Sequence, residues 1–192
     1  MGKPKESLAF GSGSLLGNIT DLLLQCTWPV VVVSRDSTQE LPPLPLESTL
    51  IHDEQPQAGP LAAIASGMRH VQAAGDLGEQ DAVFVTGCDA PFLSEDAIGW
   101  LCQQLGDHQA VMPRTDDRLQ PLCAVYRISC LPILEELMAS GVETVRTIAE
   151  KANTRILEEA DLRAIDSNLD FMRTVNTPEE YEEACRKADT TS

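Results

Sequence analysis

The stretch "VFVTGCDAPFLSED", residues 83–96, decides the fold class. Its first residues form an apolar run typical of a buried strand, and this strand ends by delivering one carboxylate, Asp89. Pro91 cannot donate to a sheet ladder, and Ser94 is a favoured N-cap for a helix over residues 94–105. A strand that passes directly into a helix is typical of an α/β fold.

The rest of the chain repeats this alternation of strands and helices. The patterns predict strands at residues 28–34, 49–53, 81–89, 109–113, 119–127 and 171–178. They predict helices at residues 14–25, 60–74, 94–105, 130–139, 142–151 and 178–188. The strand at 28–34, "WPVVVVS", is expected to be fully buried and parallel to its neighbour. We therefore expect one α/β domain over residues 1–192, with a mainly parallel sheet and helices on both faces.

The charge of the chain excludes several classes of function. Fourteen basic and thirty acidic residues give a formal net charge of −16. Such a surface repels nucleic acid and anionic membranes, so neither is an expected partner. Residues 1–10 are too polar for a signal peptide, and no apolar run is long enough to cross a bilayer. A cytoplasmic location is expected, and a polyphosphate ligand would need local cations or a metal ion.

The six cysteines favour packed, reduced thiols over a metal or redox site. They contain no C-x-x-C pair, and most lie in apolar segments. Cys88 lies beside Asp89, but no histidine is near it in the sequence. We therefore expect Cys88 to be structural.

Polar side chains gather at the predicted carboxyl ends of three strands: Ser34 with Arg35, Asp53, and Asp89. In open α/β sheets, ligands bind beyond these ends. A single aspartate there is commonly a turn former or a helix cap, but the helix after Asp89 has its own cap at Ser94. One carboxylate in such a crevice suits Mg²⁺, which combines one or two carboxylates with substrate phosphates. We expect Mg²⁺ at Asp89.

Two further features fit a nucleotide pocket. Lys5 precedes the first turn and helix, where its ammonium group could contact a phosphate, although a solvated lysine is the simpler interpretation. Gly59, before the helix at Pro60, would let a ligand approach the backbone closely. Asp53 and this helix start would form one wall of the pocket.

Taken together, these segments resemble the molybdenum cofactor guanylyltransferases, within the nucleotidyltransferases of Rossmann-like fold. The matching segments in order are "MGKPK", "VVVVS", "LIHDEQPQAGPLAAI", "VFVTGCDAPFL", "AVMPR", "LQPLCAVYR", "LPILEELMASGVETVRTIAE" and "VNTPEEYEEA". The pairing of "GPLAAI" with "CDAPFL" at this spacing is the most specific element, and the segments together cover nearly the whole chain.

The resemblance implies transfer of GMP from GTP to the terminal phosphate of molybdopterin, with release of pyrophosphate. It implies that Asp89 holds Mg²⁺ and acts in catalysis, that Lys5 contacts the GTP phosphates and that Asp53 contacts the nucleotide. Ser34 stands where such enzymes can carry an asparagine that touches GTP, and its hydroxyl has a shorter reach. Residues 118–126, "RLQPLCAVY", would face the pterin. Further partners would be other cofactor-biosynthesis proteins or apo-molybdoenzymes.

The sequence departs from the family at its front. The family opens with a buried strand and a glycine-rich loop, Leu-Ala-Gly-Gly-x-Ser-x-Arg, before the Met-Gly…Lys with which this chain starts. Loss of about three backbone donors to phosphate would weaken nucleotide binding by roughly 10³-fold, and the flanking strands would keep unpaired edges. Either the natural protein begins upstream, which we favour, or this is a truncated paralogue with a binding role.

Other functions stay open at this point. One is a related nucleotidyltransferase that uses CTP or another phosphorylated acceptor. A second is a non-catalytic protein that binds the cofactor, which the absent glycine loop favours. The third is an α/β domain whose aspartates serve only as turns, but this does not explain why polar residues gather on one edge.

Overall fold

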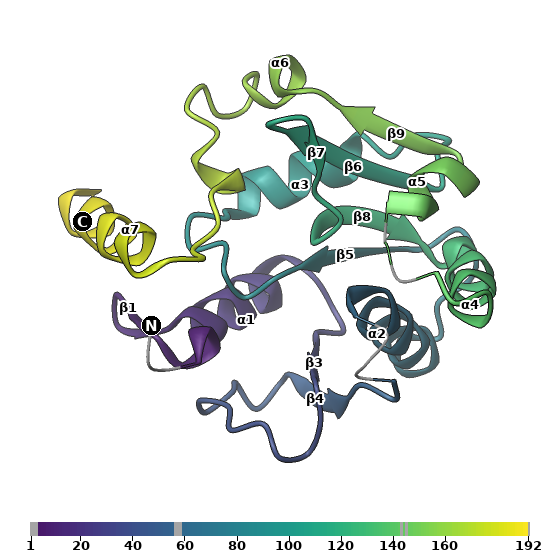
Figure 1. Ribbon diagram of the computed structural model, residues 1–192, viewed down its shortest axis with the longest axis horizontal. Coiled ribbons are helices and arrows are strands. Elements are labelled where there is room, and N and C mark those ends of the chain that lie inside the picture. The colour runs from purple at the N-terminus through teal and green to yellow at the C-terminus, as the bar shows by residue number, and fades with distance from the viewer. Residues whose placement is uncertain (1–3, 56–58, 143, 145, 192) are drawn as a thin grey trace.

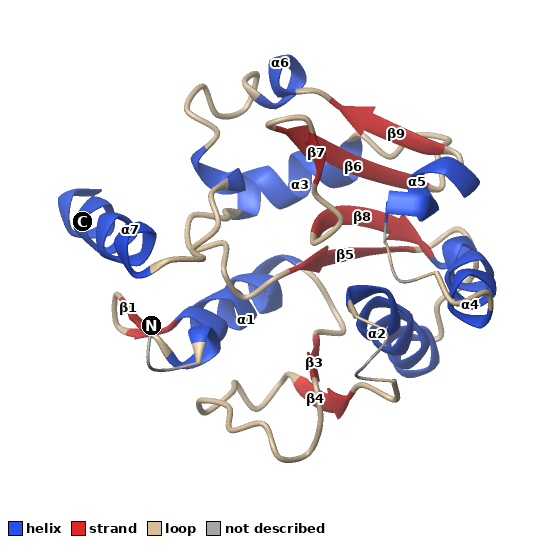
Figure 2. Cartoon of the chain, in the orientation of Figure 1, coloured by secondary structure: helices blue, strands red, loops and turns tan. Residues whose placement is uncertain are grey.

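The computed structural model describes residues 4–55, 59–142, 144 and 146–191. It folds into an α/β arrangement of helices around β-sheets (Figures 1 and 2). The α-helices are α1 Leu15–Cys26, α2 Pro60–Gly75, α3 Glu95–Gln103, α4 Leu131–Ala139, α5 Arg146–Lys151, α6 Glu159–Leu162 and α7 Pro178–Thr191. The strands are β1 Ala9–Phe10, β2 Gly13–Ser14, β3 Val31–Ser34, β4 Thr49–His52, β5 Ala82–Thr86, β6 Ala110–Thr115, β7 Arg118–Leu119, β8 Cys123–Arg127 and β9 Thr154–Leu157. The described residues also form the 3₁₀ turns η1 Lys5–Ser7, η2 Ile128–Cys130 and η3 Asp170–Met172. None of the described helices is long and apolar enough to cross a membrane.

The larger sheet mixes parallel and antiparallel pairs. Its strand order is β5-β8-β6-β7, and β9 pairs with β6. The pair β6–β9 is parallel, whereas β8 runs antiparallel to both β5 and β6. The expectation of a mainly parallel sheet therefore holds only in part, because β8 returns through a short connection from β6 and inserts beside β5. β5, β6 and β9 still run in one direction.

Helices cover both faces of this sheet, as expected. Alternate side chains of β6 and β8 point to opposite sides because the side-chain period of a strand is two. Ala110, Met112 and Tyr126 pack with α2, α4 and α5. Val111 and Val125 pack with α1, α3 and α6. The chain thus buries two apolar layers against a single sheet.

The helix starts follow local capping chemistry. The Ser14 hydroxyl accepts from the backbone N–H of Gly17 at 3.0 Å, and the Ser94 hydroxyl accepts from that of Ala97 at 3.2 Å. Gly59 caps α2 with φ +67°, a left-handed value that favours glycine. These contacts confirm the helices expected after residues 14, 59 and 94.

Several sequence expectations were wrong. Residues 171–178 are not a strand but the 3₁₀ turn η3 and an irregular segment. The strand β9 and the short helix α6 were missed, because both are only four residues long. The expected strand 119–127 is interrupted at residues 120–122, where Pro121 breaks the ladder between β7 and β8. Residues 143 and 145 of the helix expected at 142–151 lie outside the described residues.

A second, separate sheet consists of β3 and β4, which pair in parallel (Figure 1). Among the described strands, none pairs with the other edge of β3, and β5 pairs only with β8. A cavity of about 290 Å³ lies between β3 and β5, with α1 and α2 also lining it. We call this cavity the β3–β5 slot. Because β3 borders it, residues Val31–Val33 are half-buried rather than fully buried as expected.

Candidate functional site

Asp89 lies just beyond the carboxyl end of β5, where the sequence placed it. Its carboxylate folds back over Gly87, and a Cβ added at Gly87 would lie 2.7 Å from Asp89 Oδ1. The Asp89 carbonyl accepts a hydrogen bond from the Val175 N–H at 2.8 Å. The Asp89 side chain is 27% exposed, so its charge stays available to a ligand. A side chain at Gly87, two residues before the aspartate, would therefore displace the Asp89 carboxylate from this position.

Lys5 faces Asp89 from the 3₁₀ turn η1. Its Nζ lies 3.6 Å from Asp89 Oδ2 and donates to Asn176 Oδ1 at 2.6 Å. Half-exposed ion pairs of this kind contribute little to stability. Their arrangement brings one cation, one carboxylate and one amide together at the edge of the sheet.

Asn176 is held in place by the start of α7. The Glu180 carboxylate accepts from the backbone N–H groups of Asn176 at 2.7 Å and Thr177 at 2.9 Å, and the Thr177 hydroxyl accepts from the Glu180 N–H. This is a capping box, which the sequence Thr-Pro-Glu-Glu encodes. The first two bonds, in that order, lower the pKa of Glu180 below its usual value.

Ser34 and Asp53 form a neighbouring group on the smaller sheet. The Ser34 hydroxyl lies 2.6 Å from His52 Nδ1, and the Ser34 carbonyl accepts from the Asp53 N–H at 2.8 Å. Asp53 Oδ1 accepts from the Gln55 N–H at 2.9 Å, which is the turn-forming role of an aspartate. In the described part of the chain, no hydrogen bond or ion pair joins Ser34 or Asp53 to Lys5 or Asp89.

Burial makes Cys88 inert. Burial first, and then the charges of Asp89 and Glu6, raise the pKa of the Cys88 thiol to about 11. A thiol with that pKa is almost wholly protonated at neutral pH and is a poor nucleophile. All six cysteines are free thiols, as expected.

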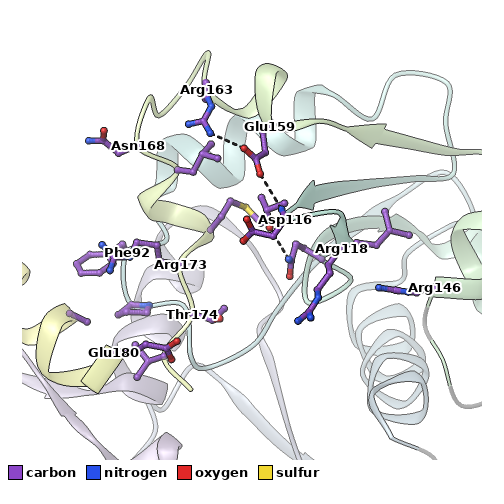
Figure 3. A pocket seen from close by; sticks show the side chains of 18 residues that line it. Phe92, Asp116, Arg118, Arg146, Glu159, Arg163, Asn168, Arg173, Thr174 and Glu180 are labelled. Carbon is purple, nitrogen blue, oxygen red and sulfur yellow. Dashed lines mark hydrogen bonds and ion pairs between the residues drawn. The ribbon is translucent and has the colours of Figure 1, made fainter. Parts of the chain in front are cut away.

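Next to Asp89 opens a cavity of about 710 Å³, which we call the arginine cavity (Figure 3). It begins at Pro91 and Phe92 and ends at α6 and α7. Four of the chain's fourteen basic residues line it: Arg118, Arg146, Arg163 and Arg173. Three acidic residues, Asp116, Glu159 and Glu180, also line it, so its four arginines leave one net positive charge there, in a chain of net charge −16.

Two of these four arginines are neutralised by the protein and two are not. Arg163 pairs with Glu159 at 2.7 Å, and Arg173 pairs with Glu183 at 2.6 Å. Arg118 and Arg146 have no ion pair within the residues that the structure describes. Figure 3 shows both side chains, which line the cavity from β7 and from the start of α5. They are the groups best placed to receive an anionic ligand.

Comparisons with known proteins agree with this geometry. Residues 1–156 match the family model described as the MobA-like NTP transferase domain. The chain belongs to the MobA-like NTP transferase family. The matched residues include Lys5, Asp89, Arg118 and Arg146.

Individual relatives cover the MobA-like chain to different extents. It is 28% identical to a probable molybdenum cofactor guanylyltransferase of Clostridium perfringens over 70% of this chain and 66% of that relative. A probable molybdenum cofactor guanylyltransferase of Bacillus mycoides is 26% identical over 95% of this chain and 88% of its own length. The solved molybdopterin-guanine dinucleotide biosynthesis protein A of Archaeoglobus fulgidus shares the fold, with a TM-score of 0.73 and 22% identity over 98% of this chain and 92% of that chain.

The donor set at Asp89 fits a shared metal ion rather than a complete protein site. Within the described residues, no group of three or more His, Cys, Asp or Glu side chains could hold a metal ion. Asp89 offers one exposed carboxylate, the minimum that Mg²⁺ needs when phosphates supply other oxygens. Asp89 is therefore the residue at this edge that could hold such an ion, with phosphate oxygens as its further ligands.

Sequence reasoning missed Asn176 and Arg146, and it included Arg118 only as part of the segment 118–126 expected to face the pterin, without a contact of its own. The capping signal Thr-Pro-Glu-Glu was read only as a helix start, although it also positions the residue before it. The two arginines carry no local pattern, since β7 and α5 bring them together only in the folded MobA-like chain.

Proposed function

We propose that the chain transfers GMP from GTP to the terminal phosphate of molybdopterin, forming the guanine dinucleotide cofactor and pyrophosphate. The observation that carries this proposal is the Lys5–Asp89 pair at the carboxyl end of β5, directly beside the arginine cavity. A nucleotidyltransferase needs both a triphosphate site and an acceptor site, and these two features supply them. The names of the curated relatives give the substrates.

The triphosphate would lie at Lys5 and Asp89. Lys5 would direct its ammonium group to the phosphates, leaving the Asn176 amide as its second partner. Ser34 and Asp53, on the neighbouring strands, would bound the nucleoside from the side of the smaller sheet. Asp89 would hold Mg²⁺ against the phosphates, where the ion neutralises charge that develops on them during transfer.

The acceptor would lie in the arginine cavity. Molybdopterin carries a terminal phosphate, and guanidinium groups bind phosphate with paired, charge-assisted hydrogen bonds. Arg118 and Arg146 are the two cavity arginines without an ion pair among the described residues, so they would meet this phosphate or the pterin. Pro91 and Phe92 line the cavity on the side of Asp89, so the two substrates would meet there.

The reaction needs no covalent enzyme intermediate. A terminal phosphate oxygen of molybdopterin attacks the α-phosphorus of GTP in line, and a new P–O bond forms. The bond between the α-phosphorus and the bridging oxygen to the β-phosphorus breaks, and pyrophosphate leaves with that electron pair. The chain contributes by positioning the two substrates and by stabilising negative charge through Lys5. The cytoplasmic location and the single domain over residues 1–192 are part of the same proposal.

A second candidate is non-catalytic binding of the cofactor, which the open β3–β5 slot favours. An empty position between two strands at the nucleotide side would loosen the groups that hold GTP. Molybdopterin could still occupy the arginine cavity, which the slot does not border.

One experiment separates these candidates. The chain is titrated by calorimetry with GTP and CTP in the presence of Mg²⁺, and transfer is followed with α-labelled GTP and molybdopterin. Label in the dinucleotide product, with preference for GTP over CTP, supports the proposal. Preference for CTP indicates the related cytidylyltransferase reaction. Molybdopterin binding without nucleotide binding contradicts the proposal and supports the binding protein.

A further inference from the structure

Three carboxylates line the arginine cavity, and the protein itself uses two of them (Figure 3). Glu159 Oε2 accepts from the Arg163 guanidinium at 2.7 Å, and the Glu180 carboxylate caps α7. The third is Asp116, whose carboxylate accepts no hydrogen bond and forms no ion pair with any residue that the structure describes. It therefore shares the cavity with the two arginines that lack an ion pair among the described residues.

The turn that holds Asp116 does not need its carboxylate. Asp116 and Asp117 connect β6 to β7, between the paired residues Thr115 and Arg118. Their φ values are +48° and +58°, the left-handed values of a type I′ turn, where asparagine and glycine are equally suitable. An aspartate that stabilises a turn usually accepts from a backbone N–H two residues on. Within the described chain the Asp116 carboxylate makes no such bond, so it is available to a ligand.

The hairpin tip is tied to the start of α6 at two points. The Asp116 N–H donates to Glu159 Oε1 at 3.1 Å. On β6, the Arg114 guanidinium pairs with the Glu158 carboxylate at 2.8 Å. These contacts restrict the hairpin before any ligand arrives, and a group that is already ordered loses less freedom on binding. The tip thus presents the Asp116 carboxylate to the cavity in a fixed position.

The charges of the cavity select a ligand with two different ends. The guanidinium groups of Arg118 and Arg146 suit a phosphate. The Asp116 carboxylate would repel a second phosphate, so the cavity disfavours a plain oligophosphate. A carboxylate accepts with both oxygens, and two neighbouring, parallel N–H groups satisfy both of them at once. A 2-amino-4-oxopyrimidine ring presents such a pair, one from a ring nitrogen and one from the amino group beside it. A volume of about 710 Å³ accommodates a bicyclic ring with a phosphate.

We propose that Asp116 is a specificity residue that receives the two N–H donors of a 2-amino-4-oxopyrimidine ring, while Arg118 and Arg146 hold the phosphate of the same molecule. In the proposed function this ring is the pterin of molybdopterin, so the identity of the ligand rests on that function. Guanine carries the same edge, and the experiment therefore includes both rings. A ring with a carbonyl in place of the amino group is rejected, because its lone pairs face the carboxylate.

Ring preference is measured by fluorescence titration of the whole chain without nucleotide, at a pH where both probes have neutral rings. The probes are the phosphate monoesters of 6-hydroxymethylpterin and of 6-hydroxymethyllumazine, which carries a carbonyl oxygen where the pterin carries the amino group. The parent chain should bind the pterin phosphate more tightly by ~10-fold or more, since charged hydrogen bonds are lost with lumazine. Asp116→Asn offers one acceptor and one donor, which match lumazine, so its preference should reverse.

Asp117→Asn is the matched control. It makes the same change of charge in the same turn, at a residue outside the described lining of the cavity, and should keep the preference of the parent. Asparagine is favoured at these φ values, so both variants should fold. GTP and ITP, which lacks the 2-amino group of guanine, are titrated beside the pterins in the presence of Mg²⁺.

The outcomes separate this inference from the proposed reaction. An unaltered pterin preference in Asp116→Asn, the same change in Asp117→Asn, or failure of the parent to bind either probe overturns the inference. A change in the ratio of GTP to ITP affinity alone would assign the ring to guanine and overturn the pterin as the occupant. Transfer of label with an unaltered ring preference removes this inference and leaves the proposed function standing. A reversed preference without transfer supports the inference and contradicts the proposed reaction.

Discussion

The Lys5 ammonium group lies 3.6 Å from a carboxylate oxygen of Asp89, across the carboxyl end of β5. Neither side chain is fully buried, and the Lys5 group also donates to the Asn176 side chain. Three distant parts of the chain therefore converge on one point: η1, the end of β5 and the segment before α7. At that point the Lys5 ammonium group could contact a polyphosphate, and the Asp89 carboxylate could contact a metal ion.

Replacing the Asp89 charge should abolish turnover and leave the fold intact. Asp89→Asn keeps the size of the side chain but removes the charge, so transfer of label from GTP should fall by about 10²–10³-fold. The far-UV spectrum and the urea midpoint should stay close to those of the parent. Cys88→Ala is the matched neighbour, since a protonated, packed thiol does no chemistry. Unchanged turnover of Asp89→Asn would show that the assignment is wrong.

Gly87→Ala should damage the site without removing a functional group. A Cβ at Gly87 would lie 2.7 Å from Asp89 Oδ1, so the carboxylate must move. A displacement of about 1 Å can cost about 10²-fold in rate, and single-turnover kinetics would measure this loss. Gly99→Ala in α3 is the control, because a Cβ there meets nothing within 4 Å. Equal turnover of the two variants would mean that the position of Asp89 does not matter.

The two arginines without described ion pairs should bind the acceptor rather than drive the chemistry. Arg118→Ala and Arg146→Ala should each raise the KM for molybdopterin by about tenfold or more, since a charged hydrogen bond contributes about 1.5–3 kcal/mol. Both kcat and the GTP affinity should change little. Arg155→Ala on β9, whose guanidinium bonds the Gln104 carbonyl, is the control. If these variants lose GTP affinity instead, the arginine cavity binds the nucleotide rather than the acceptor.

The capping box at α7 should make the folding stability of the chain fall as the pH is lowered. The pKa of Glu180 is lowered by the N–H groups of Asn176 and Thr177. A depressed pKa in the folded state adds stability above the unfolded pKa, near 4.5, and this stability is lost as pH falls through the folded value. Glu180→Gln keeps an N3 acceptor but does not titrate. Its urea midpoint should therefore decline less than that of the parent between pH 6 and pH 3; parallel curves would contradict this.

Local chemistry predicted the helix starts and the strand ends well. Ser14, Gly59 and Ser94 mark the beginnings of α1, α2 and α3 because a cap needs only its own neighbours. Asp89 was placed correctly for the same reason, since the apolar run, the glycine and the proline are contiguous. The α/β class followed from the order of these elements.

Pairing between distant segments was harder to predict. The segment at residues 171–178 has the composition of a strand, yet β9 holds the place beside β6, where Ile156 and Leu157 pack on opposite faces. Four-residue elements carry too little periodicity to outweigh a longer apolar segment. The contact of Lys5 with Asn176 also depends on the return of α7 to the N-terminal side, which no local pattern contains.

The separation of β3 and β4 from the larger sheet has a consequence for how the molecule comes apart. Ladder hydrogen bonds make neighbouring strands melt together, but none crosses from β3 to β5 in the described residues. The small ribbon is held by side-chain packing, chiefly on α2. It can therefore open as a unit of its own, with a lower free energy than the five-stranded body. Limited proteolysis should therefore cleave the connection at residues 35–48 first, while the larger sheet and its helices stay folded.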